Sequence, residues 1–143
     1  MTKDQLIVMA KEAAAAHGID PALVCAVCHH ESAGWKRWAV RYEPGFYRRY
    51  VQSMDLRETE KITRSTSYGL MQVMGQVARE FGFHGEYLSE LLDPRTNLAY
   101  GCRKLADCLT KTKGDVRAAL MRYNGGGIPN YPDLVLRHID QYK

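Results

Sequence analysis

Hydrophobic residues recur every three or four positions along most of this chain, and turn residues interrupt the pattern at intervals. This period is typical of amphipathic helices that bury one face. We predict helices over 2–17, from 21 to before 34, over 46–62 as one or two surface helices, after 70–74 up to 82, over 86–92, from 94 to before 114, over 116–123 and over 131–141. Because little of the chain alternates as a strand does, we expect an all-α fold, or nearly so, in a single domain over 1–143.

Capping residues support the first two helix boundaries. Thr2 and Gln5 form the pattern of a capping box, and Gly18 is typical of the position just beyond a helix. Asp20 followed by Pro21 then supplies a side-chain cap and a proline in the first turn. The second helix is therefore expected to begin at Pro21.

Three segments carry loop signals instead. Residues 64–69 are rich in serine and threonine, and the glycines of 124–127 are expected to need positive φ. Residues 35–47 combine aromatic and basic side chains with proline and glycine, which favours a loop or short extended segments. We expect these aromatics either to stack against sugar rings or to pack as a lid over the core.

A carboxylate ends an almost wholly apolar helix. Glu31 follows Cys28, Val27 and Val24 at spacings of three, four and seven, which places it on an apolar stripe. Desolvation and the negative end of the helix dipole both raise the pKa of a carboxyl in that position. Such a group suits a general acid at neutral pH. The alternative is a glutamate at a frayed helix end with its carboxyl in water.

Composition narrows the class of protein only a little. The chain has 143 residues, of which 45% are hydrophobic and 25% charged, as is ordinary for a globular protein with one core. No segment has the length of a membrane span, and no dense Lys/Arg block predicts nucleic-acid binding. The net charge of +4 suits a polyanionic surface such as a bacterial envelope, without requiring one.

The polar residues at the start of the chain do not resemble a secretory signal. We therefore expect a phage-encoded protein, a chain exported by another route, or a fragment of a longer protein.

The four cysteines form two pairs in the sequence, Cys25 with Cys28 and Cys102 with Cys108. The first pair, followed by two histidines, has the spacing of a metal or redox motif. The second pair does not match it, and cysteine is also a small residue that is readily buried. We expect structural thiols, no metal and no cofactor, with a metal or redox site and a bridge between the two helices as the alternatives.

Four short motifs, in order along the chain, resemble those of a known family. They are Glu31-Ser32, Gly69-Leu70-Met71-Gln72, Asp93-Pro94-x-x-Asn97-Leu98-x-x-Gly101 and Tyr123-Asn124-Gly125-Gly126. Together they resemble the soluble lytic transglycosylases, which share the goose-type lysozyme fold. The resemblance spans roughly residues 20–131 and implies a lysozyme-like domain whose central buried helix carries the catalytic glutamate.

The resemblance implies cleavage of the β-1,4 bond between N-acetylmuramic acid and N-acetylglucosamine in peptidoglycan. Glu31 matches the family's single catalytic acid, and Tyr123 matches a tyrosine that reaches toward its carboxyl. The candidates for substrate binding are Ser32, Tyr68, Met71, Gln72 and Asn124. The expected product is a 1,6-anhydro sugar, formed without a second carboxylate.

The chain also departs from the family pattern. Residues 73–75 replace a proline that is common there, and the interval from Glu31 to Gly69 is longer than in compact members. Glu43 lies in this interval. If it faces Glu31 across about 6.5 to 9.5 Å, the pair suits an inverting hydrolase in which Glu43 holds a catalytic water. The alternative is that Glu43 pairs with Arg41 or another arginine and anchors the loop.

Three functions therefore stand open. The first is a lytic transglycosylase, and the second is a muramidase that releases a reducing sugar. The third is a non-catalytic module with a wall-binding or structural role, or a zinc protein that uses the cysteine pair. For the two enzymes, the expected partner is the glycan strand of peptidoglycan in the bacterial wall, with no nucleic acid and no membrane insertion. We expect the protein to act as a monomer.

Overall fold

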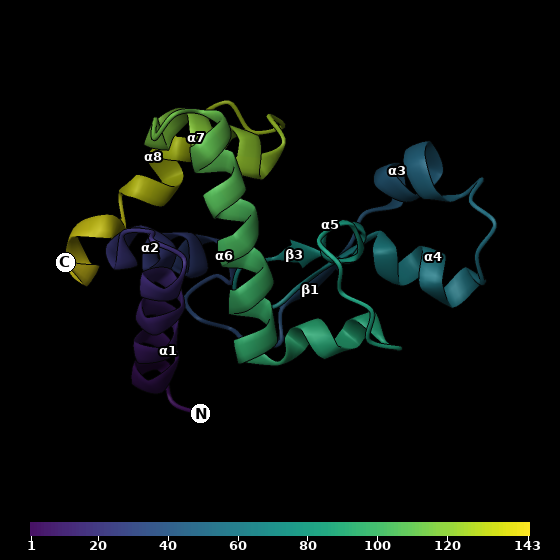
Figure 1. The fold of residues 1–143 in the computed structure, drawn as a ribbon, viewed down its shortest axis with the longest axis horizontal. Coiled ribbons are helices and arrows are strands. Elements are labelled where there is room, and N and C mark those ends of the chain that lie inside the picture. The colour runs from purple at the N-terminus through teal and green to yellow at the C-terminus, as the bar shows by residue number, and fades with distance from the viewer.

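Helices make up most of the structure, a computed structural model that describes residues 1–143 (Figure 1). The α-helices are α1 (Lys3–Ala16), α2 (Pro21–Glu31), α3 (Pro44–Phe46), α4 (Glu58–Arg64), α5 (Gly75–Glu80), α6 (Pro94–Lys111), α7 (Val116–Asn124) and α8 (Tyr131–Leu136). Short π- and 3-10 helices add η1 (Tyr47–Val51), η2 (Leu88–Leu92) and η3 (Ile139–Tyr142). This architecture confirms the predicted lysozyme-like, nearly all-α fold. None of the helices is long and apolar enough to span a membrane.

A small antiparallel sheet lies among the helices, in the strand order β1 (Val40–Tyr42), β2 (Thr66–Tyr68) and β3 (Val73–Met74). Val40 pairs with Tyr68, and Ser67 pairs with Met74. The prediction of a loop over 64–69 is therefore wrong, because this segment forms the central strand. Its serines and threonines are buried between two strands, and that context overrides their preference for turns.

The helix α2 is the centre of the core. Its residues from Ala22 to Cys28 are all buried, and α1, α8 and η3 pack around it. The side chain of Asp20 caps its first turn by accepting a hydrogen bond from the Ala22 amide at 3.0 Å. As predicted, the helix begins at Pro21. It ends at Glu31, three residues after Cys28, the last buried residue of the helix.

The turn between β2 and β3 is fastened to the start of α6. The side chain of Asn97 accepts a hydrogen bond from the Met71 amide at 2.9 Å and donates to the Tyr68 carbonyl at 2.7 Å. Gly69 has φ +72°, and a Cβ on it would lie 2.6 Å from the Asn97 amide nitrogen. The motif of residues 69–72 is therefore held against the motif of residues 93–101 by these contacts.

The helices divide into two unequal groups on either side of α6 (Figure 1). On one side lie α1, α2, α7 and α8, and on the other side α3 and α4 extend beyond the sheet. Between residues 40 and 64 only Val51 is buried. The strands connect the two groups, so β1 and β2 carry residues toward the space between them.

All four cysteines are buried in the core, and none forms a disulfide in this structure. Burial raises the pKa of the Cys25 thiol to about 11 and that of Cys102 to about 12, which keeps them protonated. No group of three or more His, Cys, Asp or Glu side chains is arranged to hold a metal ion.

Candidate functional site

Glu31 lies in a cleft between the two groups of helices. The cleft has a volume of about 340 Å³, and its walls come from the end of α2, β1 and the loop after it, β2 and β3, α5, α6 and the end of α7. The residues predicted from sequence that line it are Glu31, Glu43, Gln72, Tyr123 and Asn124. The tertiary structure therefore brings together side chains that are up to about ninety positions apart in the chain.

The carboxyl group of Glu31 is largely withdrawn from water. Desolvation raises its pKa, whereas a hydrogen bond from Tyr131 and the positive charges of Lys104 and Arg41 act in the opposite direction. Desolvation is the largest of these effects, so the net shift is upward. The structure thus supports a carboxyl on the apolar stripe rather than one that projects into bulk water.

A tyrosine contacts Glu31, but it is not the one expected. The hydroxyl of Tyr131, the first residue of α8, donates to Oε1 of Glu31 at 2.8 Å. The hydroxyl of Tyr123 donates instead to the main-chain carbonyl of Met71 at 2.7 Å. The sequence did offer a signal for Tyr131, since it opens a helix on an apolar face, and a buried tyrosine needs a partner for its hydroxyl.

Three predicted substrate-binding residues do not line the cleft. Ser32, Tyr68 and Met71 are all buried. The hydroxyl of Ser32 donates to the Cys28 carbonyl and accepts a hydrogen bond from the Trp35 amide at 2.9 Å, so it closes the end of α2. Met71 packs on Gly101 of α6, where a Cβ would lie 2.7 Å from the Met71 Cβ. These residues hold the walls of the cleft rather than facing its interior.

Gln72 presents part of its amide to the cleft. Its backbone has φ +48°, and its side-chain nitrogen donates to the carbonyls of Ala39 and Gly69, each at 3.1 Å. These two bonds use both amide protons, so the oxygen is left to accept a hydrogen bond from a ligand. Gln72 is therefore a fixed acceptor in the wall of the cleft, and its role in substrate binding stays a prediction.

Asn124 stabilises the glycine turn that follows α7. With its amide oriented to satisfy both donors, its oxygen accepts hydrogen bonds from the amides of Gly127 at 3.1 Å and Ile128 at 2.9 Å. Gly125 and Gly126 have φ of +83° and +81°, which confirms the predicted positive φ at these two positions. The turn thus forms a shaped edge of the cleft.

Glu43 lines the same cleft as Glu31 and also has an ion-pair partner. Its Oε1 lies 3.1 Å from Nε of Arg41, another residue of the cleft wall. The main chain of Glu43 donates to the Ser65 carbonyl at 2.8 Å, which holds the loop against β2. Both interpretations of Glu43 therefore have a structural basis, one as a loop anchor and one as a carboxylate near Glu31.

Two of the cations at the cleft were not foreseen from the sequence. The amine of Lys104 donates to the Tyr123 carbonyl at 2.8 Å and lies 4.2 Å from the centre of the Tyr123 ring. Burial lowers its pKa. Arg122 borders the cleft from the end of α7. The signal for Lys104 was its place three residues after Gly101 and seven after Asn97, on the face of α6 that packs inward.

The aromatic side chains of residues 35–47 differ in what they contact. Trp35 packs inward and donates from its indole nitrogen to the Tyr142 hydroxyl at 2.7 Å. Trp38 and Tyr42 remain exposed, and neither lines the cleft, whereas Phe46 does. The part of the loop near α2 therefore covers the core, and its far end reaches the cleft.

The structure places a largely buried carboxyl, bonded to a tyrosine hydroxyl, in one cleft with an amide acceptor and several cations. Comparison with curated proteins and with solved structures found no match. A comparison with family models matched residues 8–131 to the model described as "Transglycosylase SLT domain". This match covers most of the chain and agrees with the four motifs, so the protein belongs to the transglycosylase SLT domain family.

Proposed function

We propose that this protein is a lytic transglycosylase that cleaves the bond between N-acetylmuramic acid and N-acetylglucosamine in peptidoglycan. Membership of the family assigns it a peptidoglycan transglycosylase or lysozyme-like function in general. The observation that carries the finer proposal is the carboxyl of Glu31, largely buried at the edge of a cleft and raised in pKa. A carboxyl that retains its proton near neutral pH is able to protonate a glycosidic oxygen.

The reaction uses one carboxyl group twice. Glu31 donates its proton to the bridging oxygen as the bond from C1 of the muramic acid to that oxygen breaks. The resulting carboxylate takes the proton from the C6 hydroxyl of the same sugar while O6 forms a bond to C1. The N-acetyl carbonyl of the substrate stabilises the positive charge at C1. The product is a 1,6-anhydro sugar, and Glu31 regains its proton.

The contacts of Glu31 suit this double role. Tyr131 holds Oε1 at 2.8 Å, so Oε2 is the oxygen left to carry the transferred proton. Lys104 and Arg41 lie near enough to stabilise the carboxylate when it forms. Gln72 offers an amide oxygen to a sugar hydroxyl or N-acetyl group.

Glu43 supports a second candidate, a hydrolase that uses water in place of the C6 hydroxyl. It lines the same cleft as Glu31. An inverting mechanism uses two carboxyl groups on opposite sides of the scissile bond, about 6.5 to 9.5 Å apart. Its ion pair with Arg41 favours the role of loop anchor instead. The mass of the product separates the two enzymes, because the anhydro sugar is lighter than the reducing sugar by one water.

The first test is Glu31→Gln, which keeps the size of the side chain and removes its acid. We expect clearing of a cell-wall suspension to fall by at least about 100-fold, the usual contribution of a general acid. The folded state should be retained, as measured by circular dichroism. Glu12→Gln, on the exposed face of α1, makes the same chemical change outside the cleft and should leave clearing unaltered.

Mass spectrometry of the released muropeptides is the second readout. The proposal expects 1,6-anhydro products from the wild type and from Glu43→Gln, with the rate of the latter within several-fold of the wild type. Reducing products that disappear in Glu43→Gln would establish the hydrolase instead. Clearing retained by Glu31→Gln would contradict both mechanisms, since each uses Glu31 as its acid. No clearing by the wild type would favour a module that only binds the wall.

A further inference from the structure

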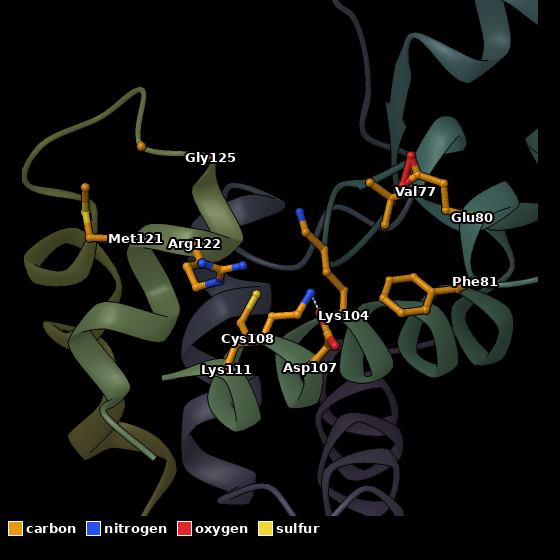
Figure 2. Close-up of a pocket in the computed structure, with 11 residues that line it drawn as sticks. Val77, Glu80, Phe81, Lys104, Asp107, Cys108, Lys111, Met121, Arg122 and Gly125 are labelled. Atoms are coloured by element: carbon orange, nitrogen blue, oxygen red, sulfur yellow. Dashed lines mark ion pairs between the residues drawn. The ribbon is translucent and has the colours of Figure 1, made fainter. Parts of the chain in front are cut away.

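A cavity larger than the catalytic cleft lies directly beside it (Figure 2). It has a volume of about 700 Å³ and is formed by α5, the second half of α6 and the end of α7. Val77, Lys104, Arg122 and Gly125 line both the cavity and the cleft. We call this cavity the basic basin. A substituent on a sugar in the cleft therefore reaches the basin by passing only these shared residues.

The cations of the basin are more available than its acids. Lys111 pairs with Asp107 at 2.9 Å, whereas Lys104 is bonded to the neutral carbonyl of Tyr123. Arg122 is exposed and forms no ion pair within the protein. Figure 2 shows Arg122 on one side of the basin, Val77, Glu80 and Phe81 on the other, and the nitrogen end of Lys104 between them. A ligand with a negative charge would meet two cations there that no carboxylate of the basin neutralises.

The opposite wall of the basin does not suit a sugar well. Phe81 is its one aromatic residue, and the guanidinium of Arg103 lies over that ring at 4.9 Å from its centre. One stacking face is thus already covered. Glu80 stands on the same wall and is the only acid of the basin without a cation partner. The lining favours a charged, flexible group over a neutral ring.

We propose that the basic basin binds the free carboxylates of the stem peptide attached to the muramic acid that reacts at Glu31. This inference rests on the proposed function. The glycan strand itself is neutral, because its N-acetyl sugars carry no ionised group and the lactyl acid of muramic acid is tied up in the peptide bond. The stem peptide is the part of the substrate that carries carboxylates. Arg122 supplies a planar pair of donors for one of them, and Lys104 contributes charge at the border with the cleft.

The experiment compares three substrates that differ only in the peptide. They are glycan strands with intact stem peptides, the same strands after an amidase has removed the peptides, and strands whose peptide carboxylates have been converted to amides. The measured quantity is kcat/KM for each, from chromatography of the cleaved products. We expect the wild type to prefer the intact peptides by about tenfold over both other substrates, as a few charge-assisted hydrogen bonds provide.

Two variants locate this preference in the basin. Arg122→Gln should lower the ratio of intact to peptide-free cleavage by about fivefold, and Lys111→Gln by about twofold. Arg117→Gln is the matched control, since it makes the same change on the same helix outside the basin and should leave the ratio unaltered. Raising the salt concentration should reduce the ratio for the wild type, because the basin is open to solvent.

Equal cleavage of all three substrates by the wild type would overturn the inference while leaving the proposed function intact. A preference that survives amidation of the carboxylates would overturn it as well, because the peptide would then be recognised without its charge. If Arg122→Gln and Lys111→Gln slow all substrates by the same factor, the basin serves the glycan or the fold instead. No cleavage of any substrate by the wild type would be a failure of the proposed function itself.

Discussion

The hydrogen bond from Tyr131 to Glu31 opposes the effect of burial on the carboxyl group. Burial favours the protonated acid, and the tyrosine hydroxyl favours the carboxylate by donating to it. The two effects together leave a raised pKa, which a general acid needs to remain active toward neutral pH. Tyr131 thus affects the pKa of a residue that lies 100 positions away in the chain.

Removing this hydroxyl gives a prediction about pH. In Tyr131→Phe the pKa of Glu31 should rise further, because the carboxylate loses its donor while desolvation remains. The acid must be protonated for the first step, so activity falls as pH rises through this pKa. The alkaline limb of kcat against pH should therefore move upward by about one pH unit, since a hydrogen bond to a charged group is worth about 1.5 kcal/mol or more.

The control for this prediction is Tyr142→Phe. Its hydroxyl bonds to Trp35 in the core and not to Glu31, so the pH profile should keep its position even if the protein is less stable. A limb that moves to lower pH in Tyr131→Phe would mean that Tyr131 stabilises the acid rather than the carboxylate.

At the scale of elements, the packing of β3 and its turn against α6 positions the wall of the cleft. The turn approaches α6 closely at Gly101, because the side chain of Met71 lies directly over this glycine. Met71 in turn precedes Gln72, the acceptor in the cleft. A change at Gly101 of α6 would therefore reach this wall of the cleft through Met71.

We expect Gly101→Ala to destabilise the protein by about 1–3 kcal/mol, the usual cost of overpacking a core. The added Cβ would stand 2.7 Å from the Met71 Cβ, and the Met71 backbone is fastened by Asn97 and gives little room. The measurement is the free energy of unfolding in urea. The same substitution at Gly45, where no atom lies within 4 Å of the new Cβ, should change stability by less than about 1 kcal/mol in either direction. Equal effects at the two positions would contradict this account of the contact.

The strand β2 marks the limit of prediction at this scale. Its serine-rich composition favours a turn, and local sequence contains no sign of the two strands that pair with it. The helices α1, α2, α6 and α7, by contrast, follow cap residues that are visible in the sequence, and the start of each was predicted to within one residue. The helices α2 and α6 end two residues before the predicted limits. Caps are local interactions, whereas strand pairing joins distant segments.

Across the whole molecule, the two sides of the cleft differ in how many of their residues are buried. α2 is buried along seven consecutive residues, and the segment 44–57 on the other side buries only Val51. Segments with few buried contacts open locally at a lower free-energy cost than the core. We therefore expect the wall that carries Glu43 and Phe46 to be more mobile than the wall that carries Glu31.

Hydrogen exchange measured by mass spectrometry tests this difference. Backbone amides of 44–57 should exchange at least about 100-fold faster than those of α2, as expected for local rather than global opening. A bound chitooligosaccharide should slow exchange at 41–46, where Arg41, Glu43 and Phe46 line the cleft, and should leave α1 unaffected. Uniform exchange across both sides would show that the protein opens as one cooperative unit.

The amino-acid sequence by itself determined the helical class, the helix boundaries set by caps, and the carboxylate at the end of an apolar helix. It also carried the four motifs of the family, because each depends on residues that are close in the chain. Only the tertiary structure decided that Tyr131 rather than Tyr123 donates a hydrogen bond to Glu31. It also decided that Ser32, Tyr68 and Met71 are buried in the protein and do not line the cleft. It also placed Lys104 and Arg122 between the cleft and the basic basin. The physical reason is that the direction of a side chain at a helix end or turn is set by the packing of elements distant in sequence, which local patterns do not encode.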